Sequence, residues 1–314
     1  AAPAGRTGLE PAVVEEQPIR VLIFAGNEAH KWHNWEKTTP AIQAQLELDP
    51  RIQVDVSNDI EDLARRPLSE YDVIVQNSYA NWQDPTPLSV EARTSFVNFL
   101  QRGGGLLLIH FANGAWHYSL PMAEASDWPE YRNIVRRVWN HDGEGEAKSG
   151  HDAFGPYTVE VLDVEHPVIS GLGDFGIVDE LYYRQDGVQP IEPLIAARSK
   201  DTGRDEPLAW TYTYGKGRVF QTLLGHSEQT YEAFEACEML RRAVAWSAAR
   251  RVVEFDPATA PPEQPREAAQ TPPADPGNLT ITLTEGRFGN ALDARRGGAF
   301  LAATTEHRDA PVRV

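Results

Sequence analysis

Histidine follows the end of three separate strand-like runs in this sequence. His30 comes shortly after the run 19–25, His110 directly after the apolar run 106–109, and His226 after a later run. Each of them lies within a few residues of glycine, which lets the backbone turn sharply. Histidine exchanges protons near neutral pH and also binds divalent metals. Three histidines at strand ends therefore predict a site for proton transfer or metal binding.

An adjacent pair of acids offers a carboxylate for the same site. Asp179 and Glu180 stand next to each other, and Glu180 is the candidate for a functional role, although such a pair can equally cap a turn. Imidazole together with carboxylate suits zinc, manganese, iron or nickel. Two versions of the site stay open: one without a metal, and one in which His30, His110 and His226 bind a divalent ion.

Four more side chains near these strand ends are candidates for substrate contact: Asn27, Asn113, Trp116 and Tyr182. Tryptophan can stack on the face of a sugar, but tryptophans in such numbers are as common in a protein core. Three other histidines are interpreted as structural residues or as residues at the rim of the site: His33, His117 and His141.

Short apolar strands alternate with helices in the first half of the chain. Strand patterns and helix patterns follow one another there, the strands at 19–25, 52–56, 71–76 and 106–109 and the helices at 36–48 and 90–100. This alternation is typical of βαβ units, whose parallel sheet binds ligands at the carboxyl ends of its strands. We therefore expect an α/β fold with a doubly wound, mostly parallel sheet.

The second half is less regular. Residues 118–152 are rich in tryptophan, histidine and glycine and are expected to form an irregular insertion with one helix at 131–139. Further strand patterns follow at 157–162, 194–197, 208–214 and 218–223, and a final helix is expected at 232–246. The sequence Tyr214-Gly-Lys-Gly-Arg218 predicts a hairpin between the last two strands.

These patterns divide the chain into four segments. Residues 1–18 are expected to be a loose arm, 19–252 the α/β domain, 253–278 a proline-rich linker, and 279–314 a truncated β segment. Seven prolines between residues 256 and 276 favour an extended linker. A tail of about 35 residues is too short to bury a core of its own, so we interpret it as the start of a β domain.

Composition excludes several classes of protein. The formal net charge of −17 disfavours binding to nucleic acid or to anionic membranes. The single cysteine, Cys237, excludes an internal disulfide and a multi-cysteine metal site. No apolar run reaches the ~18 residues of a membrane span, and no glycine motif for a dinucleotide cofactor follows a strand. The start Ala1-Ala-Pro-Ala-Gly5 is compatible with export after signal cleavage and equally with an arbitrary boundary.

Five motifs occur in a fixed order along the chain: Gly103-Gly-Gly-Leu-Leu-Leu-Ile-His110, Trp128-Pro-Glu-Tyr131, His166-Pro-Val-Ile-Ser-Gly171, Asp179-Glu-Leu-Tyr182, and Tyr214-Gly-Lys-Gly-Arg-Val-Phe220 with Leu224-Gly-His226. Together they resemble the trehalose-utilization (ThuA-like) family over roughly residues 19–250. The resemblance implies a flavodoxin-like fold related to class I glutamine amidotransferases. In those relatives a cysteine follows the strand that ends here at His110, so the resemblance also implies that this chain is not a glutaminase.

The tail carries a second resemblance. Glu285-Gly-Arg-Phe-Gly-Asn-Ala-Leu-Asp293 is similar to the opening of laminin-G-like jelly rolls of the concanavalin type. Such modules often bind carbohydrate, and here only the first strands of one are present.

Two functions follow from these residues and resemblances. The family resemblance implies an enzyme of sugar catabolism that acts on 3-keto-glycosides, small carbohydrates whose C3 ketone acidifies the C2 proton so that the C1 substituent can leave. His110 and Glu180 would transfer protons, while His30 and His226 would orient the substrate or polarise its carbonyl. The alternative is a non-catalytic module that binds a carbohydrate or a partner. Convergence of these four side chains on one point would favour the enzyme.

Overall fold

The computed structural model describes residues 17–26, 32–122 and 124–253. The chain divides into two units, Ala1–Thr259 and Ala260–Val314, and all of the described residues belong to the first. The expected tail at 279–314, nearly all of the linker, and the candidates Asn27 and His30 lie outside the described residues.

The described unit contains a nine-stranded sheet in the order β2-β1-β3-β4-β11-β10-β9-β6-β7. Its parallel part consists of β2 (Ile52–Ser57), β1 (Ile19–Phe24), β3 (Val73–Asn77), β4 (Gly105–Ile109) and β11 (Gly217–Thr222). Numbered among themselves along the chain, these strands have the order 2-1-3-4-5, which is the order of flavodoxin-like doubly wound sheets. Because they are parallel, the carboxyl ends of β1, β4 and β11 lie at one edge of the sheet.

The remaining strands are antiparallel, so the sheet is mixed and the expectation of a mostly parallel sheet was too simple. β10 (Asp205–Tyr214) pairs with β11 and with β9 (Pro193–Arg198), and β6 (Gly155–Val161) pairs with β9 and with β7 (Phe175–Asp179). The connection between β10 and β11 is the hairpin expected from the sequence, and it is too short for the crossover that parallel strands need. The sequence patterns do not predict β7.

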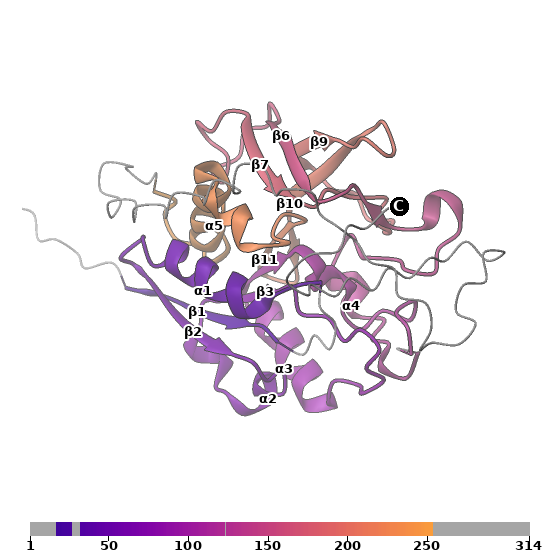
Figure 1. The fold of residues 1–314 in the computed structure, drawn as a ribbon. Coiled ribbons are helices and arrows are strands. Elements are labelled where there is room, and N and C mark those ends of the chain that lie inside the picture. The colour runs from indigo at the N-terminus through magenta and orange to yellow at the C-terminus, as the bar shows by residue number, and fades with distance from the viewer. Residues whose placement is uncertain (1–16, 27–31, 123, 254–314) are drawn as a thin grey trace, which may run out of the picture. The chain divides into compact units, whose positions relative to one another are not determined.

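Helices cover both faces of the parallel part of the sheet (Figure 1). α1 (Trp35–Leu46) and α5 (Phe234–Ser247) pack against each other on one face, and α3 (Val90–Gln101) lies with the short α2 (Asp62–Arg65) on the other. Every residue of β4 is buried between these layers, which explains why this strand is a continuous apolar run in the sequence.

The irregular segment between β4 and β6 contains a shorter helix than expected. α4 spans Tyr131–Ile134, whereas the sequence pattern predicts a helix over 131–139. Val138 instead forms a β-bridge with Asp186, and the hydroxyl of Tyr212 donates a hydrogen bond of 2.8 Å to the carbonyl of the last helical residue. These non-local partners satisfy backbone groups that a longer helix would have paired internally.

A two-stranded antiparallel ribbon stands beside the large sheet. It consists of β5 (Gly150–His151) and β8 (Tyr182–Tyr183), with His151 opposite Tyr182. The ring of Tyr183 covers Gly150, where an added Cβ would lie only 2.6 Å from a ring carbon. The ribbon thus presents His151 and Tyr182 as a cross-strand pair.

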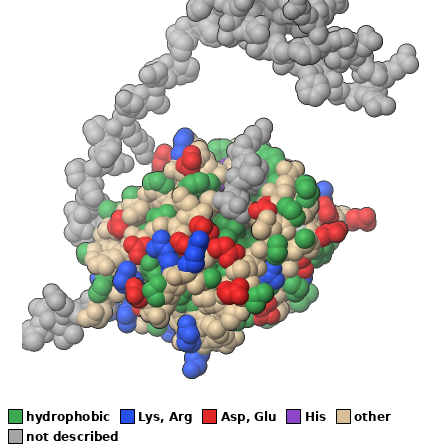
Figure 2. Space-filling model, turned by 90° about the horizontal axis from the view of Figure 1, so that it is seen from below, with side chains coloured by type: hydrophobic (Ala, Val, Ile, Leu, Met, Phe, Trp, Pro, Cys, Tyr) green, Lys and Arg blue, Asp and Glu red, His purple; other side chains and the backbone are tan. Residues whose placement is uncertain are grey.

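The surface seen in Figure 2 is of mixed charge. Acidic and basic side chains are interspersed there with polar and apolar surface. No helix within the described ranges is both long enough and apolar enough to cross a membrane.

Candidate functional site

Four side chains converge at the carboxyl edge of the parallel strands: His33, His110, Glu180 and His226. One ligand atom of each lies within 4.8 Å of those of the other three. They come from four separate segments, namely the chain between β1 and α1, the end of β4, the end of β7 and the loop after β11. We call this group the His–Glu cluster. It forms because the fold brings these strand ends to one edge of the sheet.

His110 occupies a strained turn directly after β4. Its φ is +50°, a left-handed conformation that a residue with a Cβ rarely adopts. Its Nδ1 lies 2.7 Å from the carbonyl oxygen of Leu223, and since a carbonyl only accepts, Nδ1 carries the hydrogen. Burial, with the nearby His226 in second place, lowers the pKa of His110 to about 3. The ring is therefore neutral at pH 7, with the lone pair on Nε2.

His226 meets His110 through a close approach of two backbone segments. Its Nδ1 lies 3.3 Å from Nε2 of His110 and 3.1 Å from Oε2 of Glu180. The preceding Gly225 has a φ of +127°, and a Cβ there would lie 2.6 Å from a methyl carbon of Ile109. Only glycine tolerates both the conformation and the contact.

Asp179 ties the end of β7 to the loop that carries His226. Its carboxylate accepts backbone N–H bonds from Gly225 at 2.8 Å, from His226 at 3.0 Å and from Glu180 at 2.8 Å. The side chain is fully buried, and burial raises the pKa of Asp179 to about 6 although these N–H groups oppose the shift. Asp179 thus positions two members of the cluster without belonging to it.

Glu180 is the charged member of the cluster. Burial raises its pKa, but hydrogen bonds from His151 and His226 outweigh burial and bring the pKa to about 2. Oε2 of Glu180 lies 3.8 Å from Nε2 of His110, whereas Oε1 lies 2.9 Å from Nδ1 of His151. This hydrogen bond raises the pKa of His151, whose side chain is 46% exposed. The cluster is therefore connected to solvent through His151.

His33 completes the cluster from the segment after β1. Its Nε2 lies 3.2 Å from the hydroxyl of Tyr182, and its ring stacks on Phe111 with 4.9 Å between centroids. The rings of His110 and His226 approach it edge to face at 5.0 Å and 5.2 Å. The ring is buried, so it is held by packing as well as by the hydrogen bond.

The structure brings four of the candidates together: His110, Glu180, His226 and Tyr182. Asn113 is instead buried under the segment from 137 to 139, and its amide donates to Oε1 of Gln185 at 2.7 Å. Trp116 is 2% exposed and packs in the core against aromatic residues: Tyr79, Trp128 and Tyr131.

Two residues at the site were missed in the sequence. His33 was interpreted as a structural or rim residue, yet it belongs to the cluster, and the signal that selected His30 applies equally to it, three residues further on. His151 lies in a strand of only two residues, which leaves no pattern to read. Its partner Glu180 is distant in sequence, and only the fold brings them into contact.

The donor set of the His–Glu cluster fits a divalent metal ion. Three distances among His110 Nε2, His226 Nδ1 and Glu180 Oε2 are 3.3, 3.1 and 3.8 Å. A tetrahedral ion with bonds of about 2.1 Å separates its ligand atoms by about 3.4 Å. A histidine ligand typically donates its other N–H to a carbonyl or carboxylate, as His110 does to Leu223.

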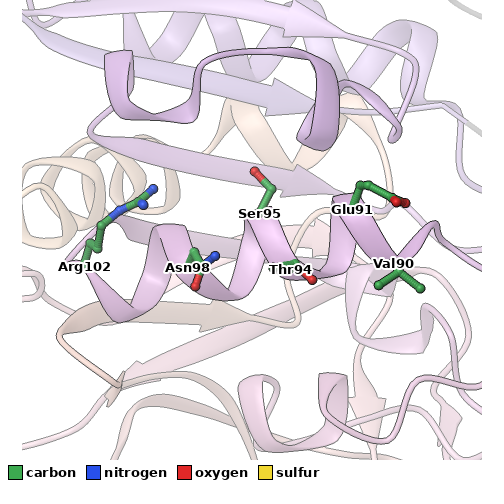
Figure 3. A pocket seen from close by; sticks show the side chains of 6 residues that line it. All are labelled: Val90, Glu91, Thr94, Ser95, Asn98 and Arg102. Atoms are coloured by element: carbon green, nitrogen blue, oxygen red, sulfur yellow. The ribbon is translucent and has the colours of Figure 1, made fainter.

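Two hollows on the described surface differ in what they offer to a ligand. A groove of about 470 Å³ runs along α3 and is lined by Val90, Glu91, Thr94, Ser95, Asn98 and Arg102 (Figure 3). Its two charged residues lie at opposite ends of the helix segment, so they cannot act on one atom. A second hollow, a cavity of about 340 Å³, has His151 in its wall, and His151 is hydrogen-bonded to Glu180 of the His–Glu cluster. The second hollow is the one next to the cluster.

Comparison with known proteins identifies the family. The family model for ThuA, described as trehalose utilisation, matches residues 20–247. The chain belongs to the ThuA family. This confirms the resemblance carried by the five sequence motifs, and the matched range includes every member of the His–Glu cluster.

Solved structures resemble this ThuA-family chain over most of the described unit. A ThuA-like protein from Parabacteroides merdae ATCC 43184 is 26% identical with a TM-score of 0.64, covering 77% of this chain and 94% of that one. A ThuA-like protein from Bacteroides uniformis ATCC 8492 is 19% identical with a TM-score of 0.52, covering 75% of this chain and 95% of that one. No curated protein matches the sequence.

Proposed function

We propose that this ThuA-family chain is an enzyme that acts on 3-keto-glycosides at the His–Glu cluster. The observation that carries the proposal is the convergence of three imidazoles and one carboxylate from four distant segments. A binding module has no need for several buried titratable groups at one point, whereas catalysis does. The family description, trehalose utilisation, supports a sugar as the substrate.

The proposed reaction is an elimination across C2 and C1 of the oxidised sugar. A base takes the proton from C2, the electrons of that bond form the C1–C2 double bond, and the C1–O bond breaks. The leaving oxygen takes up a proton to become an alcohol, and addition of water to the double bond completes hydrolysis. The reaction needs a proton carrier and a group that stabilises charge on the C3 oxygen.

Two assignments of roles are compatible with the residues, and the donor set favours the second. In the first, His110 and Glu180 transfer the protons while His226 polarises the ketone. In the second, His33, His110, His226 and Oε2 of Glu180 hold a divalent ion. Such an ion, when bound, supplies polarisation of the ketone oxygen.

His151 is the proton carrier in the favoured assignment. Its Nδ1 is held by Oε1 of Glu180 at 2.9 Å and also lies 3.0 Å from the carbonyl oxygen of Asp152, so that this nitrogen carries a hydrogen. The other nitrogen, Nε2, then takes the C2 proton and returns it to the leaving oxygen. The carboxylate of Glu180 stabilises the imidazolium formed between the two steps.

The test is release of the phenol from C1 of an aryl 3-keto-glucoside by the full 314-residue chain. The chain is freed of metal with a chelator, assayed, and assayed again after zinc, manganese, iron or nickel is added. We expect release that depends on the added ion and is abolished in His110→Ala. His166→Ala is the matched control, because His166 packs on Trp246 and bonds to Thr211 instead of to the cluster.

The other outcomes decide between the remaining assignments. Release that survives chelation and disappears in His110→Ala would support direct proton transfer by His110 and Glu180. No release with any of the ions would overturn the enzyme and support the carbohydrate- or partner-binding module.

A further inference from the structure

The cavity of about 340 Å³ beside the cluster has an unusual charge for this protein. Lys148, Arg184, His141 and His151 line it, and none of the described residues in its wall is acidic. The whole chain, in contrast, carries a formal net charge of −17. The acids next to the cavity lie outside its wall and have partners: Glu180 pairs with His151 at 2.9 Å, Glu146 pairs with Arg204 at 2.7 Å, and Asp201 accepts from the hydroxyl of Tyr183 at 3.5 Å. The cavity is therefore a local cationic site on an acidic protein.

Arg184 is held in place at the end of the ribbon. Its φ is +53°, a strained conformation for a residue with a Cβ, and its side chain lines the cavity. The guanidinium lies over the ring of Tyr183 at 5.6 Å, and one of its terminal nitrogens donates to the carbonyl of Gly145 at 3.5 Å. The buried Nε has no hydrogen-bond partner in the part of the chain that the structure describes. No acidic side chain among the described residues forms an ion pair with this guanidinium, so its positive charge is available to a ligand in the cavity.

Trp139 adds a second buried donor to the same wall. Its indole Nε1 is buried and has no partner among the described atoms, although buried donors are nearly always paired. The indole stacks on His151 with 6.3 Å between ring centroids, so one aromatic wall connects the cavity with the His–Glu cluster. Two unpaired N–H donors, two cations and an aromatic face are the complement of an anionic sugar.

We propose that this cavity binds a carboxylate or phosphate group of the substrate through Arg184 and Lys148. The substrate class of the enzyme is then an acidic sugar whose reacting carbons lie at the His–Glu cluster and whose anion lies in the cavity. The identity of the substrate rests on the proposed function, whereas the binding of the anion rests on the cavity alone.

The test measures binding, not turnover, by calorimetry on the full chain with three probes: glucose, glucuronate and glucose 6-phosphate. Charge-assisted bonds to Arg and Lys predict that at least one acidic probe binds about 10- to 100-fold more tightly than glucose. Tighter binding of glucuronate identifies a carboxylate ligand, and tighter binding of glucose 6-phosphate a phosphate ligand. Equal affinity for the three probes, or no binding of any, would overturn the proposal.

Variants assign the effect to the cavity. Lys148→Gln and Arg184→Gln together should reduce the affinity for the acidic probe to that for glucose, and Arg184→Lys should retain part of it. The control combines Arg65→Gln with Arg198→Gln, because this pair of changes also removes two positive charges, which pair with Asp59 and Asp205 on the surface. Thermal unfolding of each variant separates loss of binding from loss of fold. An acidic-probe preference that survives the double variant would place the anion elsewhere.

The two proposals fail in different ways. If the acidic probe binds through Arg184 but no 3-keto sugar is turned over, the proposed function is wrong and the anion site is supported. Suppose instead that wild type and the double variant turn over a neutral 3-keto-glucoside equally, and that the acidic probe binds no more tightly than glucose. The anion site is then wrong, and the proposed enzyme is supported.

Discussion

His110 donates its Nδ1–H to the backbone carbonyl of Leu223, across the pair of parallel strands β4 and β11. A backbone acceptor holds the imidazole in one tautomer whatever side chain stands at position 223. The lone pair on Nε2 therefore faces Glu180 and His226 in every molecule of the folded protein at neutral pH. The sheet itself positions the ring of His110, since the pairing of Ile109 with Thr222 sets the distance between the residues that follow them, His110 and Leu223.

Replacing His110 by alanine should weaken binding of a divalent ion by more than about 100-fold. Loss of an outer hydrogen-bond partner of a metal ligand already costs about 10- to 100-fold, and removal of a ligand costs more. The measurement is a competition titration of zinc against a chromogenic chelator. His166→Ala should bind zinc as the wild type does, and equal affinities of all three proteins would rule out the metal site.

Asp179→Asn should weaken the ion site although Asp179 does not belong to it. The amide can accept fewer of the backbone N–H bonds from Gly225, His226 and Glu180, so the two ligands move. We expect a lower midpoint of thermal unfolding and a zinc affinity reduced by about 10- to 100-fold. Asp174→Asn is the matched control, because Asp174 accepts one N–H at an exposed position, from Val161 at 2.9 Å. A zinc affinity unchanged in Asp179→Asn would show that Asp179 has only a structural role.

Protonation of His117 should lower stability in acid. Burial, with the nearby Arg132 in second place, lowers the pKa of His117 to about 4, and its Nδ1 accepts the backbone N–H of Ser119 at 3.1 Å. Between pH 6.5 and pH 4 the imidazole of His117 is protonated in the unfolded chain but neutral in the folded chain. The contribution of neutral His117 to the free energy of unfolding is therefore complete above pH 6.5 and is lost as the pH falls toward 4. The loss amounts to at most about 3 kcal/mol.

Urea unfolding at pH 7, 5.5 and 4.5 measures this loss. His117→Gln should be less stable than the wild type at pH 7 but should lose less stability on acidification. A loss as steep as that of the wild type would assign the acid sensitivity to other groups. His110 contributes in the same direction in metal-free protein, so both proteins are compared after chelation.

Cys237 should be inert in the folded protein. Its thiol is 2% exposed and contacts the carbonyl of Tyr231 at 3.1 Å, and burial raises the pKa of Cys237 to about 12. A thiol reagent at pH 8 should therefore react over hours in buffer and within seconds in denaturant. Cys237→Ser should retain the activity of the wild type. Rapid reaction of the native protein would contradict the buried position.

Gly225→Ala should disrupt the site and the fold around it. The added methyl would meet Ile109 at 2.6 Å in a conformation that alanine rarely adopts. We expect a clear fall in the midpoint of thermal unfolding together with loss of zinc binding. Gly173→Ala is the control, since a Cβ at that position would meet nothing within 4 Å. Equal stability of the two variants would mean that the loop after β11 can move away from β4.

The sequence by itself determined the strands and helices of the parallel part of the sheet and the family. Short runs at 19–25, 71–76 and 106–109, rich in apolar residues, correspond to β1, β3 and β4, because a strand that is buried on both faces shows its burial in its own residues. Five ordered motifs indicated the ThuA family, and histidines at strand ends pointed to His110 and His226.

Only the tertiary structure decided which residues meet. The antiparallel half of the sheet, the selection of His33 and the link from Glu180 to His151 all depend on contacts between distant segments. Local patterns report whether a segment is buried, but the direction in which two strands pair, and the side chains that face each other at their ends, depend on the packing of the whole domain.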